Sequence, residues 1–210
     1  LNFANLSAGA TGSGGGAGTV TSEITTNLAL HSGTILGNVA LTVAKTKTLT
    51  LTAAQANGKT IGGEAATVSG TAGGSIILTG IDNSSLNFAN LTAGATGSGG
   101  NAGTVTSAIG SDLTLHSGTV LGNVALTVAK DATLTLSAAQ ASGKAITGSD
   151  STSGGEVGGS VIVTSLDGSA AYSLNTLIAG SAGGGGNAGS ITAAVAVDTT
   201  LDSGTNLGTT

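Results

Sequence analysis

The stretch VALTVAKTKTLTLTAA, residues 39–54, alternates between two kinds of side chain. Thr and Ala fill most of its even positions, and the larger apolar residues fill odd positions: Val39, Leu41, Val43, Leu49 and Leu51. A period of two is the period of a β-strand, whose successive side chains point to opposite faces. Lys45 and Lys47 interrupt the apolar row, so the stretch predicts two strands joined by a turn.

The same pattern returns in the second half of the chain, at Val124, Leu126, Val128, Leu134 and Leu136, because the sequence is repetitive. Residues 1–61 and 86–146 are identical at 48 of 61 positions. We predict repeat 1 at residues 1–85, repeat 2 at 86–173 and a partial repeat 3 at 174–210, all in one continuous β-structure. Such near-identity suits an array selected for length or strength.

Further strands are expected at residues 19–21, 28–31, 75–79 and 86–91. Clusters of Gly, Ser and Asn separate these segments and supply turns. The one helix-like stretch, AAQA at residues 53–56, is too short to predict a helix. The sequence therefore predicts an all-β chain.

Two all-β architectures fit strand candidates that recur about every ten residues: a parallel β-solenoid (β-helix) with irregular coils, and tandem β-sandwich repeats. Sandwich cores usually contain large aromatic residues, but this chain has only Phe3, Phe88 and Tyr172, and it has no Pro. A narrow solenoid is filled by stacked Leu, Val, Ile, Ala and Thr, which this chain has in abundance. We therefore favour the solenoid. The sandwich remains the alternative because the repeat contains no clean short period.

The composition restricts the classes of function. Only 7% of residues are charged, against about 25% in ordinary domains. However, 39% are hydrophobic, so the chain is not of the disordered type. A net charge of −5 with five Lys and no Arg argues against nucleic-acid binding. No long apolar run is present, which predicts no membrane-spanning segment. The chain lacks Met and starts within a repeat, so we expect a piece of something longer or a processed product.

Two pairs of strings carry a resemblance: VALTVAKTKTLTLTAAQANGKTI with VALTVAKDATLTLSAAQASGKAI, and GGSIILTGID with GGSVIVTSLD. They resemble the Thr/Gly/Ala-rich tandem repeats of giant bacterial secreted or cell-surface proteins, which include adhesins and S-layer-like or matrix filament proteins. The resemblance covers nearly the whole chain and implies an extracellular or cell-surface location and β-architecture. It supplies no catalytic residue.

His31 and His116 occupy the same place in the motif LHSG, where the third copy has Asp202. A metal site needs several ligands within a few ångströms, but these positions lie a whole repeat apart. Ser32 follows His31, yet no carboxylate recurs to orient a catalytic triad. We interpret these histidines as solvated or turn-capping residues.

The glycine-rich segment GSGGGAG at residues 12–18 recurs at 97–103 and 183–189. A dinucleotide site would need a following helix, and none is expected, so we predict a flexible loop or a coil corner. The calcium-binding β-roll motif is absent, since the runs lack its Asp. Calcium candidates remain at Asp82 and Asp167, which occupy matching positions after a strand. Carbonyl groups could complete such a site, but a turn-capping Asp is the favoured interpretation.

Thr48, Thr50 and Thr52 form a row of hydroxyl side chains. Such rows can bind ice or polysaccharide, but Thr is also a common residue on an exposed strand face. We favour this second interpretation.

These patterns together predict a non-catalytic extracellular structural protein that self-associates into a filament, sheath or surface layer. Low charge and exposed strand edges favour a homo-polymer. The alternative is the stalk or repeat region of a giant bacterial adhesin. Polysaccharide or a cell surface is a further expected partner, and no cofactor is expected apart from the calcium candidates. An enzyme would need acids or bases clustered in a groove, which the sequence does not indicate.

Overall fold

The computed structural model describes residues 2–9, 18–97, 99–195, 200–201 and 203–207. These residues form fifteen strands and two one-turn helices. They divide into two compact units, which are Leu1–Thr79 with Asn87–Thr106, and Gly80–Leu86 with Ser107–Thr210. The opening segment of the second sequence repeat thus packs with the first unit.

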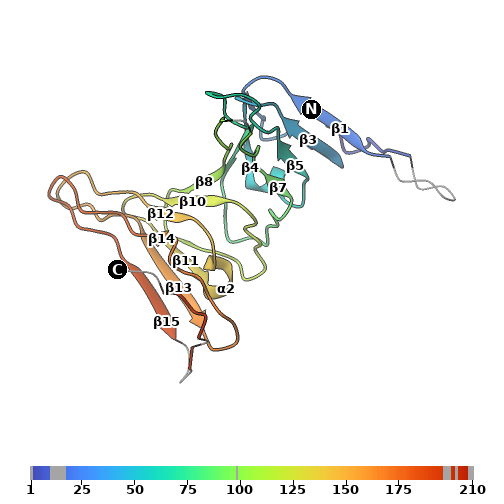
Figure 1. Ribbon diagram of the computed structural model, residues 1–210. Coiled ribbons are helices and arrows are strands. Elements are labelled where there is room, and N and C mark those ends of the chain that lie inside the picture. Colours follow the sequence, from blue (N-terminus) through green and yellow to red (C-terminus); the bar gives the residue numbers. More distant parts are fainter. Residues whose placement is uncertain (1, 10–17, 98, 196–199, 202, 208–210) are drawn as a thin grey trace. The chain divides into compact units, whose positions relative to one another are not determined.

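The first unit contains two sheets. The strands and helix, in chain order, are β1 (Val20–Ile24), β2 (Leu28–Ala29), β3 (Val39–Val43), β4 (Thr48–Thr52), α1 (Ala53–Ala56), β5 (Ile61–Gly63), β6 (Ser75–Thr79) and β7 (Leu91–Thr92). One sheet has the order β1-β3-β5-β7, and the other contains β2-β4-β6. Strands β1 and β3 lie side by side in Figure 1.

The second unit repeats this arrangement. Its elements are β8 (Val105–Ile109, which starts just before the unit), β9 (Leu113–Thr114), β10 (Ala125–Val128), β11 (Thr133–Ser137), α2 (Ala138–Ala141), β12 (Ile146–Gly148), β13 (Ser160–Leu166), β14 (Leu177–Ile178) and β15 (Ile191–Val195). One sheet contains β8-β10-β12-β14, and the other has the order β9-β11-β13-β15. Strands β13 and β15 run side by side in Figure 1.

Pairing between the described strands is parallel. Within each unit, consecutive strands alternate between two sheets, so paired strands lie two places apart in the chain order. For example, Leu126 in β10 pairs with Ile146 in β12. Immunoglobulin-type sandwiches are built from antiparallel sheets. The described pairing therefore shows an all-β chain with parallel sheets and does not support the alternative of tandem β-sandwiches.

The connections between paired strands differ in length. A short connection separates Val20 from its partner Val39. A clearly longer one separates Ile146 from its partner Leu177. This variation explains why no single short period is visible inside the sequence repeat.

The alternation predicted for residues 39–54 is confirmed. Each apolar residue on the predicted inner face is at most 5% exposed, whereas Thr48, Thr50 and Thr52 are half-exposed. The predicted turn is also present, and Thr46 lies there at φ 62. Its counterpart Asp131 lies at φ 60. The second unit buries the equivalent apolar row, namely Val124, Leu126, Val128, Leu134 and Leu136.

Two sequence-based expectations were wrong. Residues 53–56 form a helix, α1, as do the equivalent residues in α2. Residues 86–91 do not form one strand: only Leu91 is in a strand, although Leu86 and Phe88 are buried. The buried segment that precedes β7 is therefore irregular.

Closely packed glycines line one border between the two sheets of each unit. We call these residues the glycine seam: Gly63, Gly73, Gly74, Gly94 and Gly103 in the first unit, and Gly148, Gly158, Gly159, Gly180 and Gly189 in the second. Backbone hydrogen bonds run through the seam, with Gly74 N donating to Glu64 O at 2.9 Å and Gly94 N donating to Gly74 O at 2.9 Å. A Cβ on Gly94 would overlap Glu64 O. Only glycine lets these connections approach so closely.

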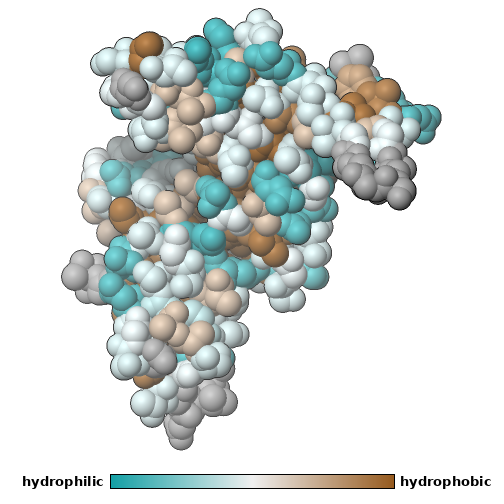
Figure 2. Space-filling view, turned by 45° about the vertical axis from the view of Figure 1, so that its right-hand side comes forward, coloured by the Kyte–Doolittle hydropathy of each residue, from teal (hydrophilic) through white to brown (hydrophobic). Residues whose placement is uncertain are grey.

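The visible surface carries few large apolar patches. On the face shown in Figure 2, hydrophobic side chains form small separate groups among residues of intermediate hydropathy. Among the described residues, the exposed large apolar side chains include Ile35 at 49%, Val120 at 45% and Ile178 at 57%.

Candidate functional site

Both histidines of the LHSG motif cap a turn. His31 Nδ1 accepts a hydrogen bond from Gly33 N–H at 3.0 Å, and His116 Nδ1 accepts the same bond from Gly118 N–H at 3.0 Å. The predicted turn-capping interpretation is confirmed for these two residues. Asp202, the third member of the set, lies outside the described residues.

Sequence reasoning missed the glutamines that hold these turns. Gln140 Nε2 donates to His116 O at 2.8 Å and to Thr119 O at 3.1 Å. The same side chain completes a capping box with Ser137 at the start of α2. The signal was present in the sequence, since Ser or Thr followed three residues later by Gln is a capping-box pattern.

Asp82 and Asp167 each use a carboxylate oxygen within their own turn. Asp82 Oδ1 accepts hydrogen bonds from the backbone N–H and the hydroxyl of Ser84. Asp167 Oδ1 accepts from Ser169 N–H at 3.0 Å and from Tyr172 Oη at 2.9 Å. These bonds, led by those from the serine hydroxyls, lower the pKa of both carboxyl groups.

This geometry is that of a turn-capping Asp. The described residues contain no group of three or more His, Asp or Glu side chains placed to share a metal ion. Turn capping is the interpretation that the sequence favoured for Asp82 and Asp167, and calcium binding there stays the less favoured alternative.

Glu156 lies at the centre of a polar cluster in the second unit. Lys130 Nζ contacts its Oε1 at 2.6 Å, while Thr152 N–H and Ser153 N–H donate to its Oε2 at 2.7 and 3.0 Å. The hydrogen bond from Lys130 is the main reason that the pKa of Glu156 falls to about 2. In the first unit, the Lys45 ammonium instead donates to Thr67 Oγ1 at 3.3 Å.

The predicted row of threonines continues onto the neighbouring strand. Thr48 lies opposite Ser75, Thr52 lies opposite Thr79, and between them Thr50 lies opposite Ile77. The second unit has the same arrangement, with Thr135 opposite Ile162. The isoleucines interrupt the hydroxyl array at its centre, so the face is mixed in chemistry.

Of the glycine-rich segments, residues 183–189 are fully described by the structure. Most of residues 12–18 lies outside the described residues. Residues 183–189 pack closely on an earlier segment of the chain: Gly183 N donates to Ser151 Oγ at 2.9 Å, and a Cβ on Gly186 would overlap Ser151. After this segment comes β15, a strand, so the dinucleotide-binding context is missing there.

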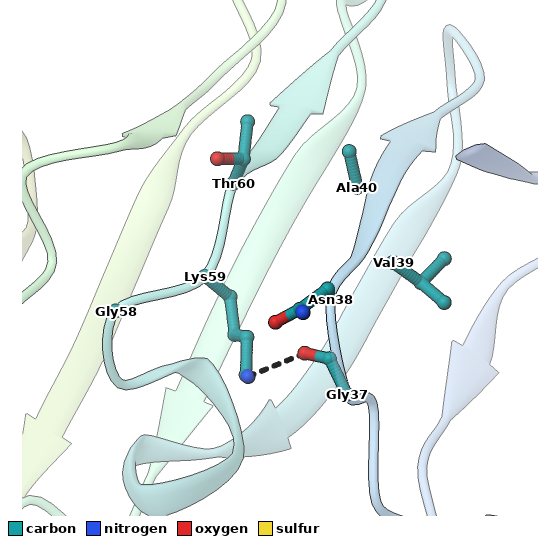
Figure 3. Close-up of a pocket in the computed structure, with 7 residues that line it drawn as sticks. All are labelled: Gly37, Asn38, Val39, Ala40, Gly58, Lys59 and Thr60. Atoms are coloured by element: carbon teal, nitrogen blue, oxygen red, sulfur yellow. Dashed lines mark hydrogen bonds between the residues drawn. The ribbon is translucent and has the colours of Figure 1, made fainter. Parts of the chain in front are cut away.

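A small polar recess lies beside β3 and β5. Its volume is about 150 Å³, and it is lined by Gly37, Asn38, Val39, Ala40, Gly58, Lys59 and Thr60. Figure 3 shows the Lys59 side chain reaching across to the carbonyl of Gly37, with the Asn38 side chain beside it. Lys59 Nζ donates to Gly37 O at 2.5 Å.

The second unit repeats this lysine contact. Lys144 Nζ donates to Gly122 O at 2.7 Å. Residues 37–40 and 122–125 both read GNVA, and both lysines follow a glycine. Sequence reasoning did not single out these lysines, because a scattered Lys carries no motif and only the fold brings each to a carbonyl in a distant part of the sequence.

Comparison with known proteins gives no relative for this chain. No family model, no curated protein and no solved structure matches it. The helices in the described part are four residues long, so none is able to cross a membrane. The site residues must therefore be interpreted from their own geometry.

Proposed function

We propose that this chain is a non-catalytic extracellular structural protein built as a parallel β-solenoid, which self-associates into a filament, sheath or surface layer. The observation that carries the proposal is the strand order. Within each unit, consecutive strands alternate between two parallel sheets, and paired strands lie two places apart in the chain order. A chain that winds in coils produces this pattern, because each coil adds one strand to each sheet.

The interior supports a structural role. Its buried side chains are mainly Leu, Ile, Val and Ala, and the backbone bonds to neighbouring segments along both sheets and along the glycine seam. Continuous hydrogen-bond ladders over a dry core resist extension and proteolysis. In the described residues, the side chains brought together at polar clusters serve turns and caps, as His116, Asp167 and Gln140 illustrate.

The sheet edges support self-association. Strands β2, β14 and β15 each lie at the edge of a sheet and carry exposed apolar residues, namely Leu28 at 37%, Ile178 at 57% and Val195 at 53%. None of these three strands contains a charged residue. Natural edge strands commonly use charge or a very short length to prevent pairing with other chains. Strand β15 has five residues and no charge, so its edge favours association most.

A second candidate is the stalk of a giant bacterial adhesin. The near-identity of the first two repeats favours it, because a stalk gains length by copying one unit. A stalk would be one long covalent chain that stays a separate rod, whereas a filament protein would add copies of itself.

Sedimentation velocity at rising protein concentration tests the proposal. We expect association that grows with concentration in calcium and in chelator alike. A constant monomer in both buffers would exclude self-association and favour the stalk. Association that chelator abolishes would assign a role to calcium, with Asp82 and Asp167 as the first residues to substitute.

A further inference from the structure

We propose that the recess beside Lys59, and the equivalent lysine contact at Lys144, each bind a carboxylate group, such as that of a uronate residue in an acidic polysaccharide. This inference goes beyond self-association and does not depend on it. Four observations carry it: the position of the ammonium group, the absence of acids from the recess, the repetition of the contact and the size of the recess.

The position of the ammonium group leaves it able to bind a ligand. Lys59 is half-buried, and the one hydrogen bond described for its ammonium goes to Gly37 O. An ammonium group has three N–H donors, so two remain after this bond is made. The bond fixes the end of a long side chain at the recess, which reduces the conformational entropy lost when a ligand binds.

No described residue neutralises this charge. None of the residues that line the recess is an acid. In the described part of the chain, the one ion pair joins Lys130 to Glu156, far along the sequence in the other unit. A half-buried cation without a carboxylate partner attracts an anion, and Asn38 supplies a further amide donor at the rim.

The contact is built twice. Lys144 repeats it in the second unit, with the same GNVA segment at residues 122–125. The chain contains only five lysines, and two of them are fixed in this way. The repetition indicates that the contact is a regular feature of the sequence repeat, because the same segment and the same lysine recur together.

The size and charge of the recess select the ligand. One cation balances the single charge of a carboxylate. A phosphate dianion carries more charge than one ammonium group balances, and this chain has no Arg to bind it bidentately. A volume of about 150 Å³ holds a carboxylate together with part of the unit that carries it. The net charge of −5 acts weakly at the recess, because charges beyond about 8 Å are screened at physiological salt.

Nuclear magnetic resonance of the isotopically labelled full chain tests this proposal. Backbone amides of Gly37, Gly58, Lys59 and Lys144 would be followed during titration with acetate and with a trisaccharide of galacturonate. We expect saturable shifts at both lysines, with dissociation constants on the order of hundreds of millimolar for acetate, as for a single exposed ion pair. The trisaccharide should bind more tightly than acetate.

The matched variants are Lys59→Gln with Lys144→Gln, and Lys47→Gln as the control. Gln keeps an N–H donor for the glycine carbonyl but removes the charge, so the fold should survive. The melting temperature of the double variant checks that it is folded. We expect the double variant to lose at least tenfold in affinity and the control to lose nothing. A Lys59→Arg variant keeps the charge and should retain binding if Gln disturbs the fold.

Two outcomes would overturn the proposal: no saturable shift at either lysine, or shifts that persist unchanged in the double Gln variant. A dilution series without added anion separates the two sources of a carboxylate. Shifts at Lys59 that grow with protein concentration alone would assign the ligand to a carboxylate of a second copy and exclude the polysaccharide. Sedimentation velocity on the same samples keeps this result distinct from self-association through the sheet edges.

Discussion

At the residue scale, the glycine seam brings backbone atoms of separate chain segments into direct contact. Gly180 N donates to Gly159 O at 3.0 Å, and Gly189 N donates to Gly180 O at 2.7 Å. Because no side chain separates these segments, the two sheets of a unit meet along a line of backbone hydrogen bonds. A high glycine content thus serves packing here, where loops would ordinarily be flexible.

The first prediction concerns Gly180. A Cβ at this position would overlap Ser149 O, so Gly180→Ala should lower the free energy of unfolding by about 3 kcal/mol, as overpacked sites do. Gly110→Ala is the matched control, because nothing lies within 4 Å of its Cβ position; it should be neutral or slightly stabilising. Denaturant unfolding measures the change in free energy of unfolding for both variants. Equal changes would contradict the close packing assigned to the glycine seam.

The second prediction concerns pH. The pKa of Glu156 is lowered from 4.5 to about 2, mainly by the hydrogen bond from Lys130. A carboxyl group with a lowered pKa in the folded state stabilises the fold fully above its unfolded pKa, and loses this contribution as pH falls through the folded value. The contribution of Glu156 should therefore disappear between about pH 4.5 and pH 2.

The comparison that isolates Glu156 is the Glu156→Gln variant. Melting temperatures would be measured for both proteins from pH 7 to pH 2. The variant should be less stable than the wild type at pH 7, and the difference should vanish in acid. The pKa values of Asp82 and Asp167 are also lowered. Protonation of these two residues in acid should reduce the stability of both proteins equally. A difference independent of pH would contradict this assignment.

At the scale of elements, the period-two pattern predicted the paired strands well. Thr48–Thr52 and Thr133–Ser137 bury the apolar row and leave the hydroxyl row half-exposed, because burial of alternate residues fixes the register of a strand. The third prediction uses this contrast. Leu134→Ala should cost about 2–5 kcal/mol and Thr135→Ala below about 1 kcal/mol. Similar losses in denaturant unfolding would mean that the face assignment is wrong.

The fourth prediction concerns the helices that sequence reasoning missed. Gln140 accepts from Ser137 N–H at 3.0 Å and donates to two carbonyls of the His116 turn. Gln140→Ala removes the capping box and leaves those carbonyls with one donor fewer, so it should cost about 1–2 kcal/mol. Ala139→Gln, on the exposed side of the same turn, is the control and should change the unfolding midpoint little.

Local patterns could not predict everything at this scale. The one-turn helices are too short for periodicity to reveal, and their signal was the capping pair Thr52 and Gln55. The buried segment before β7 was wrongly predicted as a strand, since Leu86 and Phe88 alternate like strand residues. The lysine contacts at Gly37 and Gly122 depend on which segments are neighbours in the fold, which no local pattern contains.

At the scale of the whole molecule, the sequence predicted an all-β chain, and the structure confirms it with parallel sheets. The two units share an order of elements, but their borders do not follow the sequence repeats, because Asn87–Thr106 packs with the first unit. The lengths of the connections could not be predicted, because the one from Val20 to its partner Val39 is much shorter than the one from Ile146 to its partner Leu177. The solenoid, the extracellular role and self-association stay proposals.

Negative-stain electron microscopy of the purified protein, with calcium and with chelator, would show whether the chain self-associates into ordered assemblies. We predict ordered fibres or sheets in both conditions, because we attribute self-association of the chain to uncharged apolar sheet edges, which need no metal. Isolated rods or beads that never assemble at any protein concentration would contradict the claim of self-association and would leave the adhesin stalk as the better account.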